Sequence, residues 1–175
     1  MTCGVKGKEK CAELFPDALW IDYIDPGYSL AVHVQQEIVK FAKERKFQPE
    51  IIFLKNHGVF VGGDSANQIK QNYSKIMETL EAFYKKNGVA LSIESGTKDA
   101  ETVMALSPKL RNWMSSDDSR LTVKSADPFE VAHGPLTPDH IVYSKSFAFE
   151  STSPDKASIE VFVAKNGYKP LVVSV

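Results

Sequence analysis

The chain has 175 residues, of which 43% are hydrophobic and 25% charged, as in an average globular protein. Twenty-one Lys and Arg residues oppose 22 Asp and Glu residues, so the composition favours neither a nucleic-acid binder nor an acidic tail protein. Two cysteines, Cys3 and Cys11, are too few for a disulfide framework, and no apolar run approaches the ~20 residues of a membrane helix. We therefore expect a cytoplasmic protein with no nucleic-acid or membrane partner.

The first half of the chain predicts alternating helices and strands. Apolar residues recur at helical spacing over residues 30–42, after an Asp25-Pro26-Gly27 turn, and predict an amphipathic helix. The apolar run Ile51–Leu54 predicts a buried strand, and residues 59–61 a second short strand.

A long helix is predicted next. Ser65 and Gln68 have the spacing of a capping box, in which both side chains satisfy free amides at a helix start. An apolar stripe then runs at helical spacing, and we expect the helix to end near Asn87-Gly88.

The second half repeats a capping residue followed by proline. Such pairs predict short helices, because the first helical turn has no amide hydrogen bond for proline to lose. Residues 120–124 and 168–175 predict strands, and Gly167 predicts the end of the last helix. The four pairs are Ser107-Pro108, Asp127-Pro128, Thr137-Pro138 and Ser153-Pro154.

The strongest candidate for chemistry is the histidine between the two predicted strands. His57 follows Asn56 and precedes Gly58, where a backbone kink can turn an imidazole toward a cleft. Neutral imidazole is a frequent metal ligand and general base. A structural turn histidine, hydrogen-bonded to a neighbouring loop, is the alternative that spacing alone leaves open.

Three blocks of sequence carry a family resemblance. Leu54-Lys55-Asn56-His57-Gly58 resembles the L-x-N-H-G motif of the class II aldolase/adducin family. Residues 20–31 (WIDYIDPGYSLA) resemble the segment before that motif, and residues 134–140 (GPLTPDH) resemble a stretch of the rhamnulose-phosphate aldolase branch, typified by bifunctional aldolase/dehydrogenase proteins.

The resemblance implies a metal-dependent site. Family members bind a divalent metal, usually zinc, through three histidines, and the metal stabilises the enediolate formed when a carbon–carbon bond breaks. By resemblance His57 matches the third ligand, while Asn56, Tyr23, Tyr28 and His140 are possible substrate-facing residues. The catalytic acid or base has no counterpart here.

The sequence lacks the pattern that supplies the other two metal ligands in this family. It contains no H-x-H pair, and His33, inside the predicted helix, is the only histidine before His57. His133 and His140 are a weaker source of ligands. We expect the chain to correspond to the C-terminal part of a longer, aldolase-like protein.

The resemblance also predicts the architecture. We expect an α/β protein, an incomplete three-layer αβα sandwich of the class II aldolase type with a C-terminal α/β extension. Residues 1–90 would form the sandwich and residues 91–175 the extension. Ring assembly of family members predicts a homo-oligomer.

Three functions remain open at this point. One is metal-dependent retro-aldol cleavage of a small sugar phosphate or hydroxy-carbonyl compound. Another is a non-catalytic, adducin-like module for oligomerisation or binding. The third and weakest is a small-molecule-binding α/β domain unrelated to aldolases, in which the Asn56-His57-Gly58 string is a coincidence.

Overall fold

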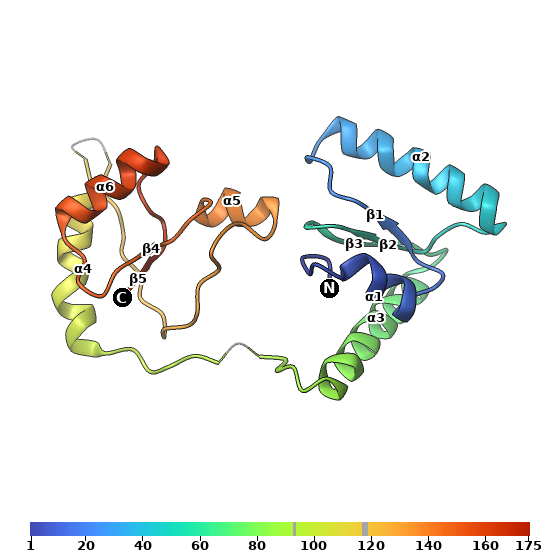
Figure 1. Cartoon of the computed structure of the whole chain (residues 1–175), viewed down its shortest axis with the longest axis horizontal. Coiled ribbons are helices and arrows are strands. Elements are labelled where there is room, and N and C mark those ends of the chain that lie inside the picture. The colour runs from blue at the N-terminus through green and yellow to red at the C-terminus, as the bar shows by residue number, and fades with distance from the viewer. Residues whose placement is uncertain (93, 117–118) are drawn as a thin grey trace. The chain divides into compact units, whose positions relative to one another are not determined.

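The protein is a mixed α/β molecule, and its computed structural model describes residues 1–92, 94–116 and 119–175. These residues form six helices and two small sheets, with no closed barrel (Figure 1). The chain divides into two compact units. The first comprises Met1–Leu91 with Leu136–Pro138, and the second comprises Ser92–Pro135 with Asp139–Val175.

A three-stranded sheet forms the centre of the first unit. The order is β1 (Leu19–Ile21), β2 (Ile51–Leu54) and β3 (Gly58–Val61), with β1 parallel and β3 antiparallel to β2. All four residues of β2 are buried, which confirms the predicted buried strand, and β3 confirms the second short strand. The sequence did not predict β1, because three residues are too short to show an alternating pattern.

One face of this sheet is covered by α2 (Tyr28–Arg45), which confirms the predicted amphipathic helix (Figure 1). Alternate strand residues point to this face because side chains alternate along a strand. The cluster consists of Leu19, Ile21, Ile52 and Leu54 from the strands with Leu30, Val34, Ile38 and Phe41 from α2.

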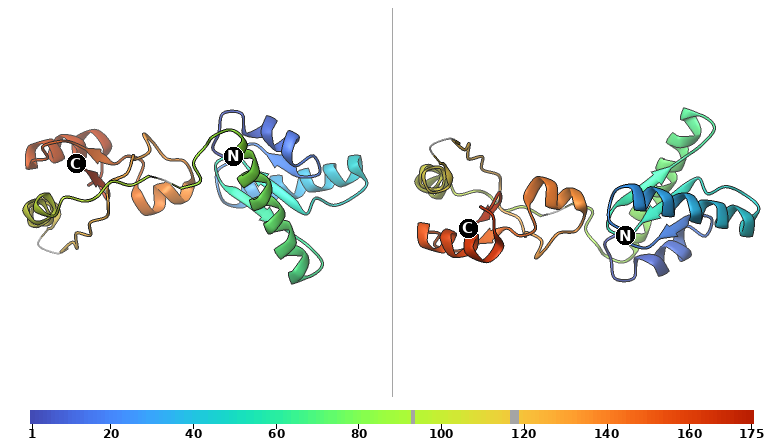
Figure 2. Two further views of the ribbon diagram at one scale, coloured as in Figure 1. Left: turned by 90° about the horizontal axis from the view of Figure 1, so that it is seen from below. Right: turned by 90° about the horizontal axis from the view of Figure 1, so that it is seen from above.

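The opposite face is covered by α1 (Gly7–Leu14) and α3 (Ala66–Lys86), so helices lie on both faces of the sheet (Figures 1 and 2). The Ser65 hydroxyl accepts from the Gln68 amide, as predicted, but the Gln68 side chain accepts from the Asp64 amide. The buried cluster on this face is Cys11, Phe15, Ile51, Phe53 and Ile76.

The second unit has its own small core. It contains α4 (Ala100–Met114), α6 (Lys156–Asn166) and most of α5 (Pro138–Ser144). A parallel pair joins β4 (Phe149–Glu150) to β5 (Val173–Ser174). Leu110, Phe149 and Ile159 are its buried residues. None of the helices in the described ranges is long and apolar enough to cross a bilayer.

Two of the four helix starts predicted at proline residues are wrong. Ser107-Pro108 lies inside α4, which begins earlier because the Asp99 carboxylate accepts from the amides of Glu101 and Thr102. No helix follows Asp127-Pro128, since the Asp127 carboxylate accepts from the Lys98 amide instead of capping a helix.

At the other two predicted starts the structure has a helix. The helix at Thr137-Pro138 begins at Pro138 as predicted, and the helix after Ser153-Pro154 begins two residues later, at Lys156, where Asp155 and Ser158 form a capping box. Gly167 ends α6 with a φ of 77°, which confirms that prediction.

The last two strand predictions fail wholly or in part. Residues 120–124 form no strand, because the Leu121 amide donates to the Ser115 hydroxyl and not to a neighbouring strand. Within 168–175 only Val173–Ser174 is a strand.

Candidate functional site

The turn between β2 and β3 presents the histidine singled out by the sequence. Asn56 has a φ of 57° and Gly58 a φ of 149°, both in the region that L side chains rarely adopt. Glycine meets this requirement at position 58, where a Cβ would meet no atom within 4 Å but would strain the backbone. His57 therefore lies between two residues whose backbone conformations are rare.

His57 is half-buried and bonded through one ring nitrogen. Its Nε2 lies 2.9 Å from the carbonyl oxygen of Ile24. A carbonyl oxygen can only accept, so Nε2 carries the proton in this bond and Nδ1 holds the lone pair of the neutral ring. The bond defines which nitrogen is available as a ligand or base.

Tyr23 forms one side of the histidine environment. Its ring stacks on His57 with centroids 5.3 Å apart and an interplanar angle of 16°. The Tyr23 hydroxyl donates to the Asp25 carboxylate at 3.0 Å, and this hydrogen bond raises the pKa of the Tyr23 phenol above its ordinary value. Tyr23 is therefore a protonated donor that orients the ring beside the imidazole.

Asn56 connects the turn to a distant segment. Its side-chain amide donates to the carbonyl oxygen of Leu136 at 2.9 Å, across 80 residues of sequence. The Cys3 thiol donates to the same oxygen at 3.5 Å, and the Asn56 backbone amide donates to the Thr2 carbonyl. The short segment Leu136–Pro138 belongs to the same unit as the turn.

The contacts bring together parts of all three resembling blocks. Tyr23 and Ile24 belong to block 20–31, His57 to block 54–58, and Leu136 to block 134–140. These positions are far apart in sequence, so only the fold places them at one turn.

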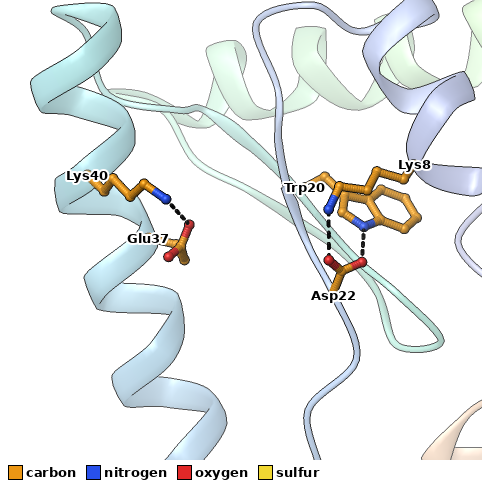
Figure 3. Close-up of polar contacts among 5 residues, drawn as sticks. All are labelled: Lys8, Trp20, Asp22, Glu37 and Lys40. Atoms are coloured by element: carbon orange, nitrogen blue, oxygen red, sulfur yellow. Dashed lines mark hydrogen bonds and ion pairs between the residues drawn. The ribbon is translucent and has the colours of Figure 1, made fainter.

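Asp22 begins the loop that leads to Tyr23. Its carboxylate accepts from Lys8 Nζ at 2.8 Å and from Trp20 Nε1 at 3.0 Å (Figure 3). The hydrogen bonds from Lys8 and Trp20 lower the pKa of Asp22, so it is a carboxylate at neutral pH. Asp22 thus fixes the exit of β1. The Glu37–Lys40 contact of 3.9 Å in the same view joins a half-buried carboxylate to an exposed lysine and is a weak surface pair.

The metal predicted by resemblance needs more donors than this turn supplies. Protein zinc sites use at least three side-chain ligands. Within the ranges that the structure describes, no group of three or more His, Cys, Asp or Glu residues is placed to hold a metal. His57 is one candidate ligand, and these residues do not complete the site.

The remaining predicted residues are placed elsewhere. Tyr28 is the first residue of α2, with its side chain 86% exposed, and His33 is half-buried in the same helix. His140 is half-buried in α5 and belongs to the second unit. The structure brings Tyr23, Asn56 and His57 together, and the roles of Tyr28 and His140 stay predictions.

The backbone partner of His57 could not be predicted from the sequence. The Ile24 carbonyl carries no signature in residue type, because every residue has such an oxygen. Asp22 could have been found, since a carboxylate one residue after a short apolar segment stands directly before Tyr23.

No protein-family model, curated protein or solved structure matches the chain. The family resemblance therefore rests on the three blocks of residues.

Proposed function

We propose that the protein is a class II aldolase-like lyase that acts on a small sugar phosphate or hydroxy-carbonyl compound. The supporting observation is the meeting of the three resembling blocks at the Asn56-His57-Gly58 turn. The finer architecture, a three-layer sandwich of the class II aldolase type, is part of the same proposal and agrees with helices on both faces of the sheet.

In this proposal His57 contributes one metal ligand, through Nδ1. A metal-bound histidine commonly donates its other ring N–H to a carbonyl, which is the bond that Nε2 makes with Ile24. A bound divalent metal would polarise the substrate carbonyl. Tyr23 restricts the imidazole plane by stacking, and the other ligands come from outside the described chain, such as neighbouring copies in a homo-oligomer.

The test is the metal content of the full chain purified from zinc-replete cells. We expect zinc in constant proportion to protein for the wild type, and its loss in His57→Ala. His33→Ala is the matched control, because His33 is also half-buried and lies in the helix before β2. Metal-free wild type, or equal zinc in both variants, would contradict a ligand role for His57.

A non-catalytic, adducin-like module is the second candidate. It is favoured by the way His57 holds the loop before α2, through the Ile24 carbonyl and the Tyr23 ring. If this is the role, His57→Ala lowers the unfolding midpoint and changes the assembly measured by light scattering, with no change in metal content. Aldol cleavage by the wild type would exclude this candidate.

A further inference from the structure

An open groove lies along α4 in the second unit, and its lining residues take no part in the proposed function. It has a volume of about 610 Å³, within the ~300–1,000 Å³ of sites for small molecules. Among the residues that the structure describes, its lining combines polar and apolar side chains and includes no acidic one: Ser107, Pro108, Arg111, Asn112, Ser115, Arg120, Thr122 and Val123.

The first wall is the polar face of α4. Ser107, Arg111 and Ser115 are spaced four residues apart, so they follow one line along the helix. Leu106 and Leu110 belong to the hydrophobic core instead. The amphipathic pattern of α4 therefore anchors the helix on its apolar face and aims Arg111 into the groove.

The second wall consists of Arg120, Thr122 and Val123, and hydrogen bonds hold this segment to the end of α4. The Leu121 amide donates to the Ser115 hydroxyl at 3.2 Å. Ser116 and Ser119 exchange two backbone hydrogen bonds, at 2.9 and 3.1 Å. These bonds hold Ser119 beside Ser116 at the end of α4, and Arg120 follows Ser119 directly. Arg111 and Arg120 therefore line the same groove.

The charges along this groove favour an anion. In the part of the chain that the structure describes, neither Arg111 nor Arg120 is in an ion pair. The C-terminal end of a helix is partly negative. Lys169 offsets that charge, because its Nζ donates to the Met114 carbonyl at 2.7 Å.

We propose that this groove binds the phosphate group of a small phosphorylated molecule. Guanidinium groups bind phosphate oxygens through paired N–H donors, and two of them can neutralise a dianion. Asn112 and the hydroxyls of Ser107 and Thr122 supply neutral polar groups beside them, and the remaining volume accommodates the rest of the molecule.

The test is calorimetric titration of the full chain at low, constant ionic strength, with inorganic phosphate and glycerol 3-phosphate as probes and acetate as the comparison anion. We expect saturable binding of both phosphates, tighter for glycerol 3-phosphate. Arg111→Gln and Arg120→Gln should each weaken binding by about tenfold or more, the typical effect of losing a charged hydrogen bond. Lys165→Gln, which removes a positive charge from α6, should leave the affinity unchanged.

Several outcomes would overturn the proposal. These are no saturable phosphate binding, equal affinity for acetate, or an effect of Lys165→Gln as large as that of the arginine variants. Unchanged thermal unfolding of the arginine variants shows that they fold. The Asp117→Asn/Asp118→Asn double variant, at positions outside the described residues, should bind phosphate at least as tightly, and weaker binding would point to a cation ligand.

Discussion

The two cysteines have opposite environments although both belong to the first eleven residues. Cys11 is 1% exposed, in the core beneath the sheet, whereas Cys3 is exposed beside Leu136. Burial raises the pKa of the Cys11 thiol from 9.0 to about 11, because the thiolate loses its hydration. The composition does not distinguish the two thiols, whereas the fold buries one and exposes the other.

We predict that a thiol reagent at mildly alkaline pH labels Cys3 rapidly and Cys11 only after unfolding. The folded state holds the Cys11 proton up to about pH 11, while the unfolded chain releases it near pH 9.0. The contribution of Cys11 to stability therefore falls as pH rises through this window. Stopped-flow absorbance measures the two rates, with Cys3→Ala as the control, and equal native rates would contradict the prediction.

Three helices, α2, α5 and α6, are followed by a residue in the left-handed conformation, and only after α6 is that residue a glycine. Gly167 follows α6 with a φ of 77°, whereas Lys46 follows α2 with a φ of 68°. A side chain in this region costs about 1–2 kcal/mol relative to glycine. The end of α2 is therefore strained in a way that the end of α6 is not.

We predict that Lys46→Gly increases the free energy of unfolding by about 0.5–1 kcal/mol, since relief of strain exceeds the added freedom of glycine in the unfolded chain. Gly167→Ala should decrease it by about 1 kcal/mol. Urea unfolding followed by circular dichroism measures both. Changes of the same sign would show that backbone conformation does not control these helix ends.

Elements were predictable where periodicity and local caps agreed. The helices α2 and α3 and the strand β2 have apolar patterns that match their final burial. The predicted helix starts at Pro108 and Pro128 are wrong for one reason. The polar residue before each proline does not cap a helix in the structure. Asp99 capped α4 earlier, and Asp127 bonded to the Lys98 amide, 29 residues away in sequence.

For the candidate site, the sequence predicted which segments contribute residues but not how these segments contact one another. His57, Asn56 and Tyr23 were identified from the sequence, and their contacts are seen in the structure. Their partners, the carbonyl oxygens of Ile24 and Leu136, could not be predicted, since a backbone acceptor depends on tertiary placement and not on residue type.

At the scale of the whole molecule, each unit buries its own apolar cluster. Phe53 belongs to the core around the three-stranded sheet, and Phe149 to the core around α4 and α6. Each unit therefore has its own source of hydrophobic stabilisation.

We predict that Phe149→Ala destabilises the second unit by about 3–5 kcal/mol, the usual cost of a cavity of this size. Amide hydrogen exchange should show lost protection in α4 and α6 and retained protection in β2. Phe53→Ala is the reciprocal control, with the loss in β2. Equal loss in both units from either variant would mean that the two cores unfold as one.

The bond between Asn56 and Leu136 has a consequence for the newly made chain. Residues 51–61 leave the ribosome as a complete hairpin sequence, but the acceptor of the Asn56 side chain is 80 residues further on. At ribosomal rates of about 5–20 residues per second, that interval is roughly 4–16 seconds. During this time the Asn56 side chain is without its acceptor, so the turn that carries His57 is the last part of the first unit to be completed.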